Sequence, residues 1–365
     1  MNIQSIDTYP ISVPLHTPFK TALRTVTVAE SIYVKVTCED GTIGWGEAPP
    51  TVVITGESLK SIEHTIKKII APRIIGKPMS KRERLFEAVQ QSCVGNTSAK
   101  AAVDIALYDC FAKRCQLPLY QLLGGYHDQL ETDYTVSVNE PGEMAKDAED
   151  YVEKGFHILK VKVGKDTIEK DLDRIQAIHR QVGDSITIRL DANQGWTPKE
   201  AIYAIQKMEA KNLPIELVEQ PVKAHDIEGL KQVTDHTSIP IMADESVFSC
   251  IDAKRIIETR SADLINIKLM KSGGIHEALK INHLAEAYGV ECMVGSMIET
   301  KLGITAAAHL AASQKNITRV DFDAPLMLTG DPVHGGVVYS QASITFSEGS
   351  GLGVHYVDLE EAALS

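Results

Sequence analysis

The sequence predicts an α/β protein in which a β/α barrel is joined to a smaller α+β lobe. The chain has 365 residues, more than the roughly 250–300 that a single hydrophobic core usually serves, so an accessory lobe is expected. From residue 131 onward, short β-rich runs alternate with amphipathic helical stretches. The runs end at nearly equal intervals, which is typical of a closed barrel of parallel strands rather than an open doubly wound sheet.

The first part of the chain, residues 1–125, has the pattern of the α+β lobe. Polar and apolar residues alternate over Ser31–Cys38, Glu39-Asp40-Gly41 supplies a turn, and Thr42–Glu47 returns as the second strand of a hairpin. From Ser58 onward the apolar residues instead follow the period of a helix. Two helical faces are predicted, formed by Ile62, Ile66, Ile69 and Ile70 and by Ala101, Ala102, Ile105 and Ala106.

Eight candidate strands make up the predicted barrel, which spans residues 126–325. They are Thr132–Val138, Ile158–Val163, Thr187–Asp191, Ile215–Glu219, Pro240–Asp244, Leu264–Lys268, Glu291–Gly295 and Thr318–Phe322. After the last strand, the turn-rich Asp331–Gly336 precedes another β-rich run. The tail, residues 326–365, is therefore expected to return to the N-terminal lobe.

The charge balance excludes two classes of partner. Asp and Glu number 49 against 37 Lys and Arg, a net charge of −12, whereas nucleic acids and anionic membranes require a Lys/Arg-rich face. No apolar run approaches the ~18 residues of a membrane span, and the N-terminus lacks the pattern of a signal peptide. Six scattered cysteines without a C-x-x-C pair indicate buried, reduced thiols, so a cytoplasmic protein is expected.

Three carboxylates end consecutive strands of the predicted barrel. Asp191, Glu219 and Asp244 should converge, because the carboxyl ends of barrel strands share one mouth. Three anions at that spacing require a cation. Oxygen ligands without His or Cys favour Mg²⁺, one ion per subunit, with Mn²⁺ as a possible substitute. Taken alone, each residue is also typical of a helix N-cap or a turn, so the prediction depends on the whole set.

Three lysines accompany these carboxylates. Lys160 and Lys162 lie two residues apart on the second strand, so both side chains leave the same face, toward the interior. Lys268 ends the sixth strand, on the opposite side of an eight-stranded barrel. Only a neutral amine accepts a proton, and we expect a neighbouring ammonium and the metal to lower the lysine pKa. Lys160 is alternatively an ion-paired or snorkelling residue.

Two amines facing each other across a metal-bound carboxylate predict proton transfer at carbon. Removal of an α-proton by Lys162 or Lys268 would leave an enediolate whose charge falls on metal-bound oxygens. Return of a proton by the other lysine from the opposite face would invert the carbon. The expected reaction is racemisation or epimerisation, with elimination and cycloisomerisation as variants through the same intermediate.

Five motifs resemble those of the enolase superfamily, in its muconate lactonizing enzyme subgroup. They are K-V-K ending at Lys162, L-D-A-N-Q-G at 190–195, V-E-Q-P at 218–221, A-D-E-S at 243–246 and I-N-I-K-L-M-K-S-G-G at 265–274. The resemblance covers nearly the whole chain. It implies a modified (β/α) TIM-type barrel and a capping domain formed by the N-terminal part and the C-terminal tail. Mandelate racemase-like members have a His after the seventh strand, where this chain has Gly295-Ser296-Met297.

Asp321 and Asp323 share one face at the end of the eighth strand, and a bound cation is their natural partner, although a turn is the alternative. A D-x-D at this place resembles the dipeptide epimerases of the superfamily, in which it holds the substrate ammonium. The segment Thr17–Thr27 resembles the family's mobile specificity loop, and its Arg24 would clamp a second carboxylate or lie exposed. The remaining expected substrate-binding residues are Thr135, Lys160, Ser296 and Ile298.

An Ala-Glu dipeptide has the ammonium, the α-carboxylate and the second carboxylate that these residues would bind. The resemblance therefore implies an isomerase that epimerises L-Ala-D-Glu and L-Ala-L-Glu in murein peptide metabolism, as a homo-oligomer. Several alternatives stay open: an o-succinylbenzoate synthase, an N-acylamino acid racemase, a muconate cycloisomerase, or a non-catalytic metal-binding protein. A further alternative is a phosphate-binding barrel that uses Ser272-Gly273-Gly274.

Overall fold

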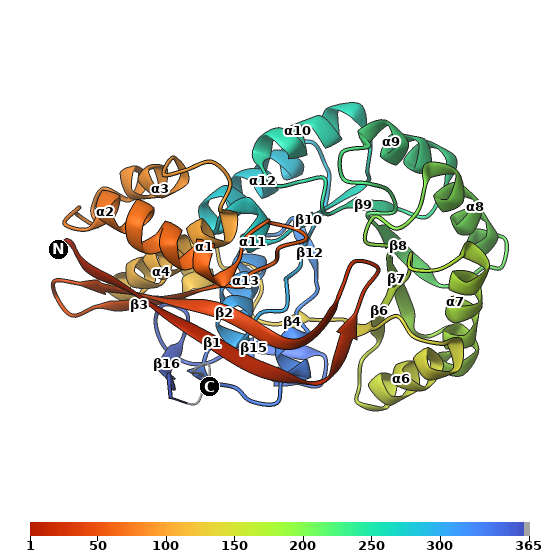
Figure 1. Cartoon of the computed structure of the whole chain (residues 1–365), viewed down its shortest axis with the longest axis horizontal. Helices are drawn as coiled ribbons and strands as arrows, with labels where there is room; N and C mark the ends of the chain where they lie inside the picture. The colour runs from red at the N-terminus through yellow and green to blue at the C-terminus, as the bar shows by residue number, and fades with distance from the viewer. Residues whose placement is uncertain (361–365) are drawn as a thin grey trace.

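An eight-stranded parallel sheet, curled on itself, forms one part of the computed structural model, which describes residues 1–360 (Figure 1). Its strands neighbour one another in chain order, so each strand returns through a helix to the place beside its predecessor. They are β5 (Tyr134–Val136), β6 (Ile158–Lys162), β7 (Thr187–Asp191), β8 (Ile215–Glu219), β9 (Ile241–Ala243), β10 (Leu264–Ile267), β11 (Cys292–Val294) and β12 (Ile317–Val320). All eight overlap the predicted strands.

The first and last strands of this sheet meet through a short contact. Thr132, just before β5, forms an isolated parallel bridge with Val320 of β12. The Thr132 hydroxyl also accepts a hydrogen bond of 2.9 Å from the amide of Phe322. These contacts close the curled sheet, and the predicted β/α barrel is confirmed.

Helices cover the outside of the barrel, as Figure 1 shows for α7 to α10. Several begin at a capping side chain that the sequence supplies, such as Thr167, Thr197, Asp226 and Ser249. The helices are α6 (Pro141–Glu153), α7 (Ile168–Val182), α8 (Pro198–Glu209), α9 (Ile227–His236), α10 (Cys250–Thr259), α11 (Leu269–Ser272), α12 (Ile275–Ala287) and α13 (Lys301–Ser313). Within residues 1–360, none is both long and apolar enough to cross a membrane.

The lobe combines an antiparallel sheet, β1 (Ile3–Lys20), β2 (Thr25–Cys38) and β3 (Ile43–Ala48), with a group of helices. Helix α4 (Thr97–Cys115) packs so closely on β3 that a Cβ at Gly46 would lie 2.0 Å from the carbonyl oxygen of Ala102. The small residues on the predicted helical face, such as Ala102 and Ala106, therefore allow α4 to approach β3 this closely. The other helices are α1 (Leu59–His64), a π-helical turn (Thr65–Ile70), α2 (Ala71–Ile74), α3 (Arg82–Gln90) and α5 (Leu119–Leu123).

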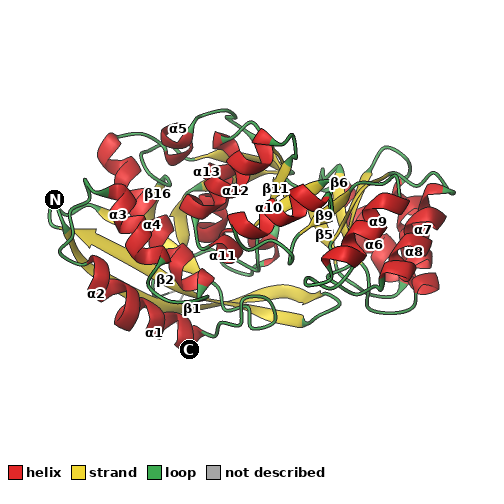
Figure 2. Ribbon diagram, turned by 90° about the horizontal axis from the view of Figure 1, so that it is seen from above, coloured by secondary structure: helices red, strands yellow, loops and turns green. Residues whose placement is uncertain are grey.

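The hairpin of β1 and β2 extends from the lobe to the barrel (Figures 1 and 2). Thr17–Thr27 was expected to be a loop, but β1 continues through Lys20 and β2 begins at Thr25, so only residues 21–24 form the turn. The Lys20 ammonium donates to Asn139 Oδ1 at 2.8 Å, and its amide donates to Ser137 Oγ at 3.2 Å. These bonds fix the tip beside the segment that follows β5.

The C-terminal tail contacts both parts of the molecule. Leu352 donates its amide to Asp109 of α4 at 2.8 Å, and Gly351 accepts from the amide of Leu119 at 2.7 Å. Its strands are β13 (Val333–Gly335), β14 (Val337–Ser340), β15 (Ser343–Phe346) and β16 (Val354–Val357), and β15 pairs with β4 (Leu130–Glu131). The exact boundaries of the predicted domains stay a prediction, and the last five residues of the tail lie outside the described part.

The cysteines only partly match the expectation of buried thiols. All six are free, and Cys38, Cys110 and Cys292 are buried. Cys115, in contrast, ends α4 at the surface and is exposed. His309 lies in the buried, largely apolar helix α13.

Inside the barrel, away from the carboxyl ends of its strands, an apolar layer lies beside one buried arginine side chain. Leu217, Met242, Leu264 and Met293 form a buried cluster, and Leu217 and Met242 precede Glu219 and Asp244 by two residues on the same inward face. Beside this layer, Arg189 Nη1 contacts Asp133 at 2.9 Å and its Nε contacts Glu216 at 2.7 Å. The same Nη1 donates to the Val320 carbonyl at 3.2 Å. One guanidinium thus connects β7 with both edges of the sheet.

We expect Arg189→Met to lower the free energy of unfolding by about 3–5 kcal/mol, because the buried Asp133 carboxylate loses its partner. Urea unfolding followed by tryptophan fluorescence measures the loss. Arg180→Met, on the exposed face of α7, is the control and should change stability by less than about 0.5 kcal/mol. Adding Asp133→Asn should restore part of the loss, whereas a loss below about 1 kcal/mol in Arg189→Met would contradict a stabilising role.

Candidate functional site

The carboxyl ends of β6 to β9 bring the predicted metal ligands into one row. Lys162 is in register with Asp191 between β6 and β7, and Asp191 is in register with Glu219 between β7 and β8. Asp244 follows the last residue of β9. All four side chains are buried. The inward face of the barrel therefore holds three carboxylates at its mouth.

Lysines from β6 contact one side of this row. Lys160 Nζ lies 2.7 Å from Glu219 Oε2, 2.7 Å from Asp321 Oδ2 and 3.3 Å from Asp191 Oδ2. Lys162 Nζ lies 2.5 Å from the same Asp191 oxygen. Lys160 is thus ion-paired at the centre of the site, which was the alternative reading of this residue.

Two further lysines contact the other side. Lys268 Nζ lies 2.8 Å from Asp244 Oδ2, and Lys271 Nζ lies 2.7 Å from Asp244 Oδ1. Lys271 also donates to the carbonyl oxygens of Asp244 and Asn266. Three strands separate β6 from β10 in the sheet. Lys162 and Lys268 therefore approach the carboxylates from different sides.

The carboxylates of the site raise the pKa of two of its lysines. Burial opposes the Lys160 ammonium, but Asp321, Glu219 and Asp191 outweigh it and raise its pKa well above the ordinary value. Burial likewise opposes the Lys268 ammonium, and Asp244 and Glu219 raise its pKa. The expected lowering includes the positive charge of the metal and stays a prediction; the carboxylates assigned to the metal here contact the ammonium groups directly and raise both pKa values.

The side chains present fit a hard divalent cation. Six buried carboxyl groups share the mouth with four lysine ammonium groups, so acidic groups outnumber the lysines there. Glu219 Oε2 and Asp244 Oδ1 are buried and make no hydrogen bond, although an ammonium lies near each of them. Within residues 1–360, no three Asp, Glu, His or Cys side chains lie close enough together to hold a metal ion without rearrangement. All donors are oxygens, the ligands that Mg²⁺ prefers. The carboxylates are those of Asp191, Glu219, Asp244, Glu245, Asp321 and Asp323.

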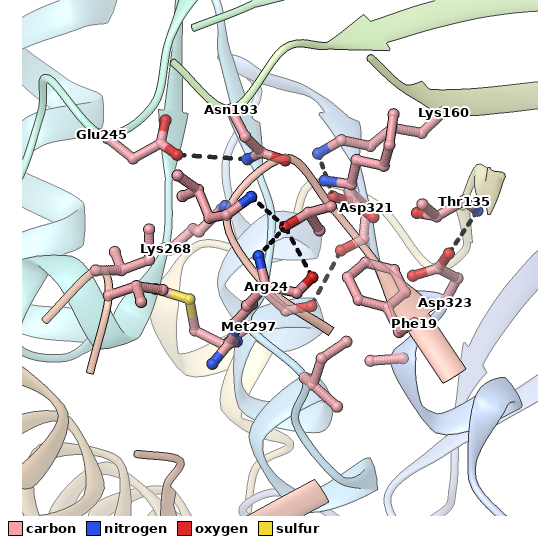
Figure 3. Close-up of a pocket in the computed structure, with 18 residues that line it drawn as sticks. Phe19, Arg24, Thr135, Lys160, Asn193, Glu245, Lys268, Met297, Asp321 and Asp323 are labelled. Atoms are coloured by element: carbon pink, nitrogen blue, oxygen red, sulfur yellow. Dashed lines mark hydrogen bonds and ion pairs between the residues drawn. The ribbon is translucent and has the colours of Figure 1, made fainter. Parts of the chain in front are cut away.

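A second acidic group lies toward β12 (Figure 3). Asp323 Oδ2 accepts a hydrogen bond of 2.6 Å from the backbone amide of Thr135 on β5. Burial, followed by the Asp321 charge, raises the pKa of Asp323 to about 7. Burial also acts against the Asp321 carboxylate, but Lys160 outweighs it and lowers that pKa to about 2. The two aspartates therefore differ, since Lys160 pairs with Asp321 alone.

The lobe closes the cavity from the other side. Arg24, in the turn of the hairpin, lines the cavity, and burial lowers its pKa. No carboxylate in the described part of the chain forms an ion pair with its guanidinium. Phe19, at the tip of β1, lies with its ring 5.8 Å from Lys162 Nζ. The segment between β11 and α13 contributes the remaining wall, Ser296, Met297 and Ile298.

The glycines after Lys271 do not form a phosphate site. Gly273 ends α11 with a positive φ, as expected for a tight turn. At the start of α12, Asp104 Oδ1 accepts from the amide of Ile275 at 2.6 Å. The Asp104 carboxyl group fills the space beside Gly274, whose Cβ would lie 2.3 Å from it. The phosphate-binding alternative is therefore contradicted.

Several residues of the site were missed by sequence reasoning. Glu245 and Lys271 lie in the quoted motifs, each within three residues of a residue that was selected. Asn193 lies in a third motif, and its Nδ2 donates to Glu245 Oε1 at 3.4 Å (Figure 3). Phe19 and Met297 also line the cavity; Phe19 lies in the expected specificity loop, and Met297 lies between Ser296 and Ile298, which were expected to bind substrate.

Two known families of domain match the chain. Residues 5–124 match the N-terminal domain of the mandelate racemase/muconate lactonizing enzyme family. Residues 143–361 match the family described as enolase C-terminal domain-like. Together these matches cover most of the chain.

Individual relatives match along nearly their whole length. The chain is 61% identical to the L-Ala-D/L-Glu epimerase of Bacillus subtilis over 97% of both chains. A substrate-liganded structure of that epimerase has a TM-score of 0.97, at 60% identity over 98% of this chain and 99% of that one. A dipeptide epimerase of Enterococcus faecalis, solved with Mg and L-Leu-L-Tyr, has a TM-score of 0.94, at 47% identity over 98% and 100%. The N-succinyl-L-Arg/Lys racemase of Bacillus cereus is 38% identical over 97% and 95%.

Proposed function

The chain belongs to the mandelate racemase/muconate lactonizing enzyme family of the enolase superfamily, and from this premise we propose that it is an isomerase that epimerises dipeptides. L-Ala-D-Glu and L-Ala-L-Glu are the proposed substrates. The observation that carries the proposal is the approach of Lys162 and Lys268 to one carboxylate cluster from different sides. The identity to the Bacillus subtilis epimerase supports the same activity.

Asp191, Glu219 and Asp244 are the proposed ligands of one Mg²⁺ per subunit, with Mn²⁺ as a substitute. They supply oxygen donors only, and acidic side chains outnumber the lysines at the mouth. When bound, Mg²⁺ supplies positive charge that offsets the negative charge developing on the substrate carboxylate. Lys160, which already contacts two of the three ligands, adds a fixed positive charge beside that carboxylate.

Lys162 and Lys268 are the proposed acid and base. One would take the α-proton of the Glu residue and the other would return a proton to the opposite face. Lys162 belongs to β6 and is confined by the Phe19 ring. Gly295 leaves room for the Lys268 side chain, because a Cβ there would lie 3.2 Å from Lys268 Cε. Ion pairs hold both amines, that of Lys162 to Asp191 and that of Lys268 to Asp244.

The ends of the dipeptide are assigned to opposite sides of the cavity. Asp321 and Asp323 would bind the α-ammonium, since Asp323 has no cationic side chain of its own. Arg24 would bind the side-chain carboxylate, because its guanidinium faces the cavity without an acidic partner. Thr135, Ser296 and Ile298 would line the space between the two ends. N-acylated substrates lack the ammonium, which disfavours the acylamino acid racemase and o-succinylbenzoate synthase alternatives.

The setting of the enzyme is also a proposal. An Ala-Glu dipeptide occurs in murein peptides, so a role in their cytoplasmic recycling follows from the substrate. A homo-oligomer is proposed as the working form.

The proposed activity predicts exchange at one carbon. Incubation of the protein with Mg²⁺ and L-Ala-D-Glu in D₂O should place deuterium on the Glu α-carbon and produce L-Ala-L-Glu, as followed by ¹H NMR and chiral chromatography. N-acetyl-L-Ala-D-Glu, which lacks the ammonium, should react at least about 100-fold more slowly, a cost of some 2.7 kcal/mol. Absence of deuterium from the dipeptide would reject the proposed function.

The lysine assignments predict a separation of two rates. Lys162→Ala or Lys268→Ala should reduce epimerisation about 1,000-fold, within the range that a positioned acid or base contributes. Each variant should retain measurable α-proton exchange with one epimer only, through the lysine that remains. Lys165→Ala, an exposed neighbour, is the control and should keep full activity. Full epimerase activity in either site variant would eliminate the two-base mechanism.

The ammonium site can be tested best at Asp323, because Asp321 also contacts Lys160. Asp323→Asn should raise the KM for L-Ala-L-Glu at least about tenfold, equivalent to 1.4 kcal/mol. The affinity for Mg²⁺, measured by calorimetry without substrate, should change less than about twofold, since within residues 1–360 Asp323 makes no direct hydrogen bond or ion pair with the three proposed ligands. Asp331→Asn, at the protein surface, is the control. Equal losses of dipeptide and Mg²⁺ affinity would instead place Asp323 in the metal site.

A further inference from the structure

The wall of the cavity that faces the lobe is a short segment without regular structure. Residues 295–300 connect β11 to α13, and Ser296, Met297 and Ile298 line the cavity. Figure 3 shows Met297 beside Arg24 and Lys268. Because this segment has no strand or helix of its own, other contacts must fix its position.

A carboxylate from the lobe provides those contacts. Glu47, on β3, is fully buried. Its Oε1 accepts from the amide of Thr300 at 2.9 Å, and its Oε2 accepts from the Thr300 hydroxyl at 2.6 Å and from the amide of Gly303 at 2.7 Å. Thr300 is the N-cap of α13, so a negative charge from the lobe lies at the positive end of a barrel helix.

Tyr33 extends this connection within the lobe. Its hydroxyl lies 2.6 Å from Thr300 Oγ1, and because that oxygen already donates to Glu47, Tyr33 is the donor. Tyr33 and Glu47 are direct partners across β2 and β3. The same β2 strand leads to the turn that carries Arg24. One sheet therefore carries Arg24 and also holds the end of the cavity wall.

Glu299 completes the arrangement from the barrel side. Its Oε1 accepts from the amide of Met297 at 2.9 Å, and its buried Oε2 has no hydrogen-bond partner. A Cβ at Gly303 would lie 2.3 Å from Glu299 Oε2 and 3.1 Å from Glu47 Oε2. Both carboxyl groups thus face the first turn of α13. Burial and the Glu47 charge raise the pKa of Glu299 to about 8, which favours its neutral form beside Glu47.

We infer that Glu47 is a positioning residue for dipeptide binding, which holds the wall Ser296–Ile298 at a fixed distance from Arg24 through Thr300. Glu47 does not line the cavity, so its effect passes through the segment that it holds. The contacts of Glu47 come from the structure. Their effect on dipeptide binding rests on the proposed function. It adds a determinant of specificity to the assigned binding residues.

Glu47→Gln tests this role, and Glu57→Gln is a matched control. Glu57 is also buried and also accepts from two amides of a helix, Ser98 and Ala99 at 2.9 and 3.1 Å, but this helix is α4, within the lobe. Glu47→Gln should raise the KM for L-Ala-L-Glu at least about tenfold while kcat changes less than about threefold. It should also alter the kcat/KM ratio between L-Ala-L-Glu and L-Ala-L-Ala. Glu57→Gln should lower Tm without changing KM or that ratio.

Hydrogen exchange tests the contacts independently of any activity. The amides of residues 296–303 should exchange at least about tenfold faster in Glu47→Gln than in the unmodified protein, and should be unchanged in Glu57→Gln. Tyr33→Phe is a milder change that should also accelerate exchange of these amides. It replaces Glu47→Gln as the test if Glu47→Gln does not fold. Unchanged exchange in these variants would overturn the inference. An unmodified protein that is inactive on every dipeptide would instead reject the proposed function.

Discussion

Six buried carboxylates share the mouth of the barrel with four lysine ammonium groups, and the fold must keep these charges together away from water. Strand register brings Asp191, Glu219 and Asp244 close together. Each contacts an ammonium group, which offsets the cost of burying its negative charge. The excess of acidic groups over lysines supports the proposed Mg²⁺ site. The apolar layer of Leu217, Met242, Leu264 and Met293 and the Arg189 ion pairs fill the barrel interior beneath these carboxylates.

The division of the molecule follows from this charge cluster. The barrel provides groups at the ends of adjacent strands, where their separation is set by the spacing of the sheet. Under the proposed function, a substrate that is held by one carboxylate also needs its other end positioned, and Arg24 and Phe19 on the β1–β2 hairpin line the cavity from the lobe. Lys20 fixes the tip of this hairpin to the barrel, and Glu47 fixes its sheet to α13.

Much of the fold could be predicted because barrel strands repeat their pattern in the sequence and end in charged residues. Lys162 and Asp191 were selected in this way, from local spacing alone. The raised pKa of Lys160 could not be predicted, because it depends on contacts such as the one with Asp321, which is 161 residues away in the chain. The contact of Glu47 with Thr300 spans 253 residues, and no local pattern marks it. Thr17–Thr27 was expected to be a loop because its many polar residues obscure the alternation of polar and apolar residues that is typical of a strand.

A crystal structure of the protein with Mg²⁺ and L-Ala-L-Glu tests the central claim most directly. The account predicts Mg²⁺ on Asp191, Glu219 and Asp244, with the Lys162 and Lys268 amines on opposite faces of the Glu α-carbon. A structure with both amines on one face, or with the dipeptide ammonium away from Asp323, would contradict it.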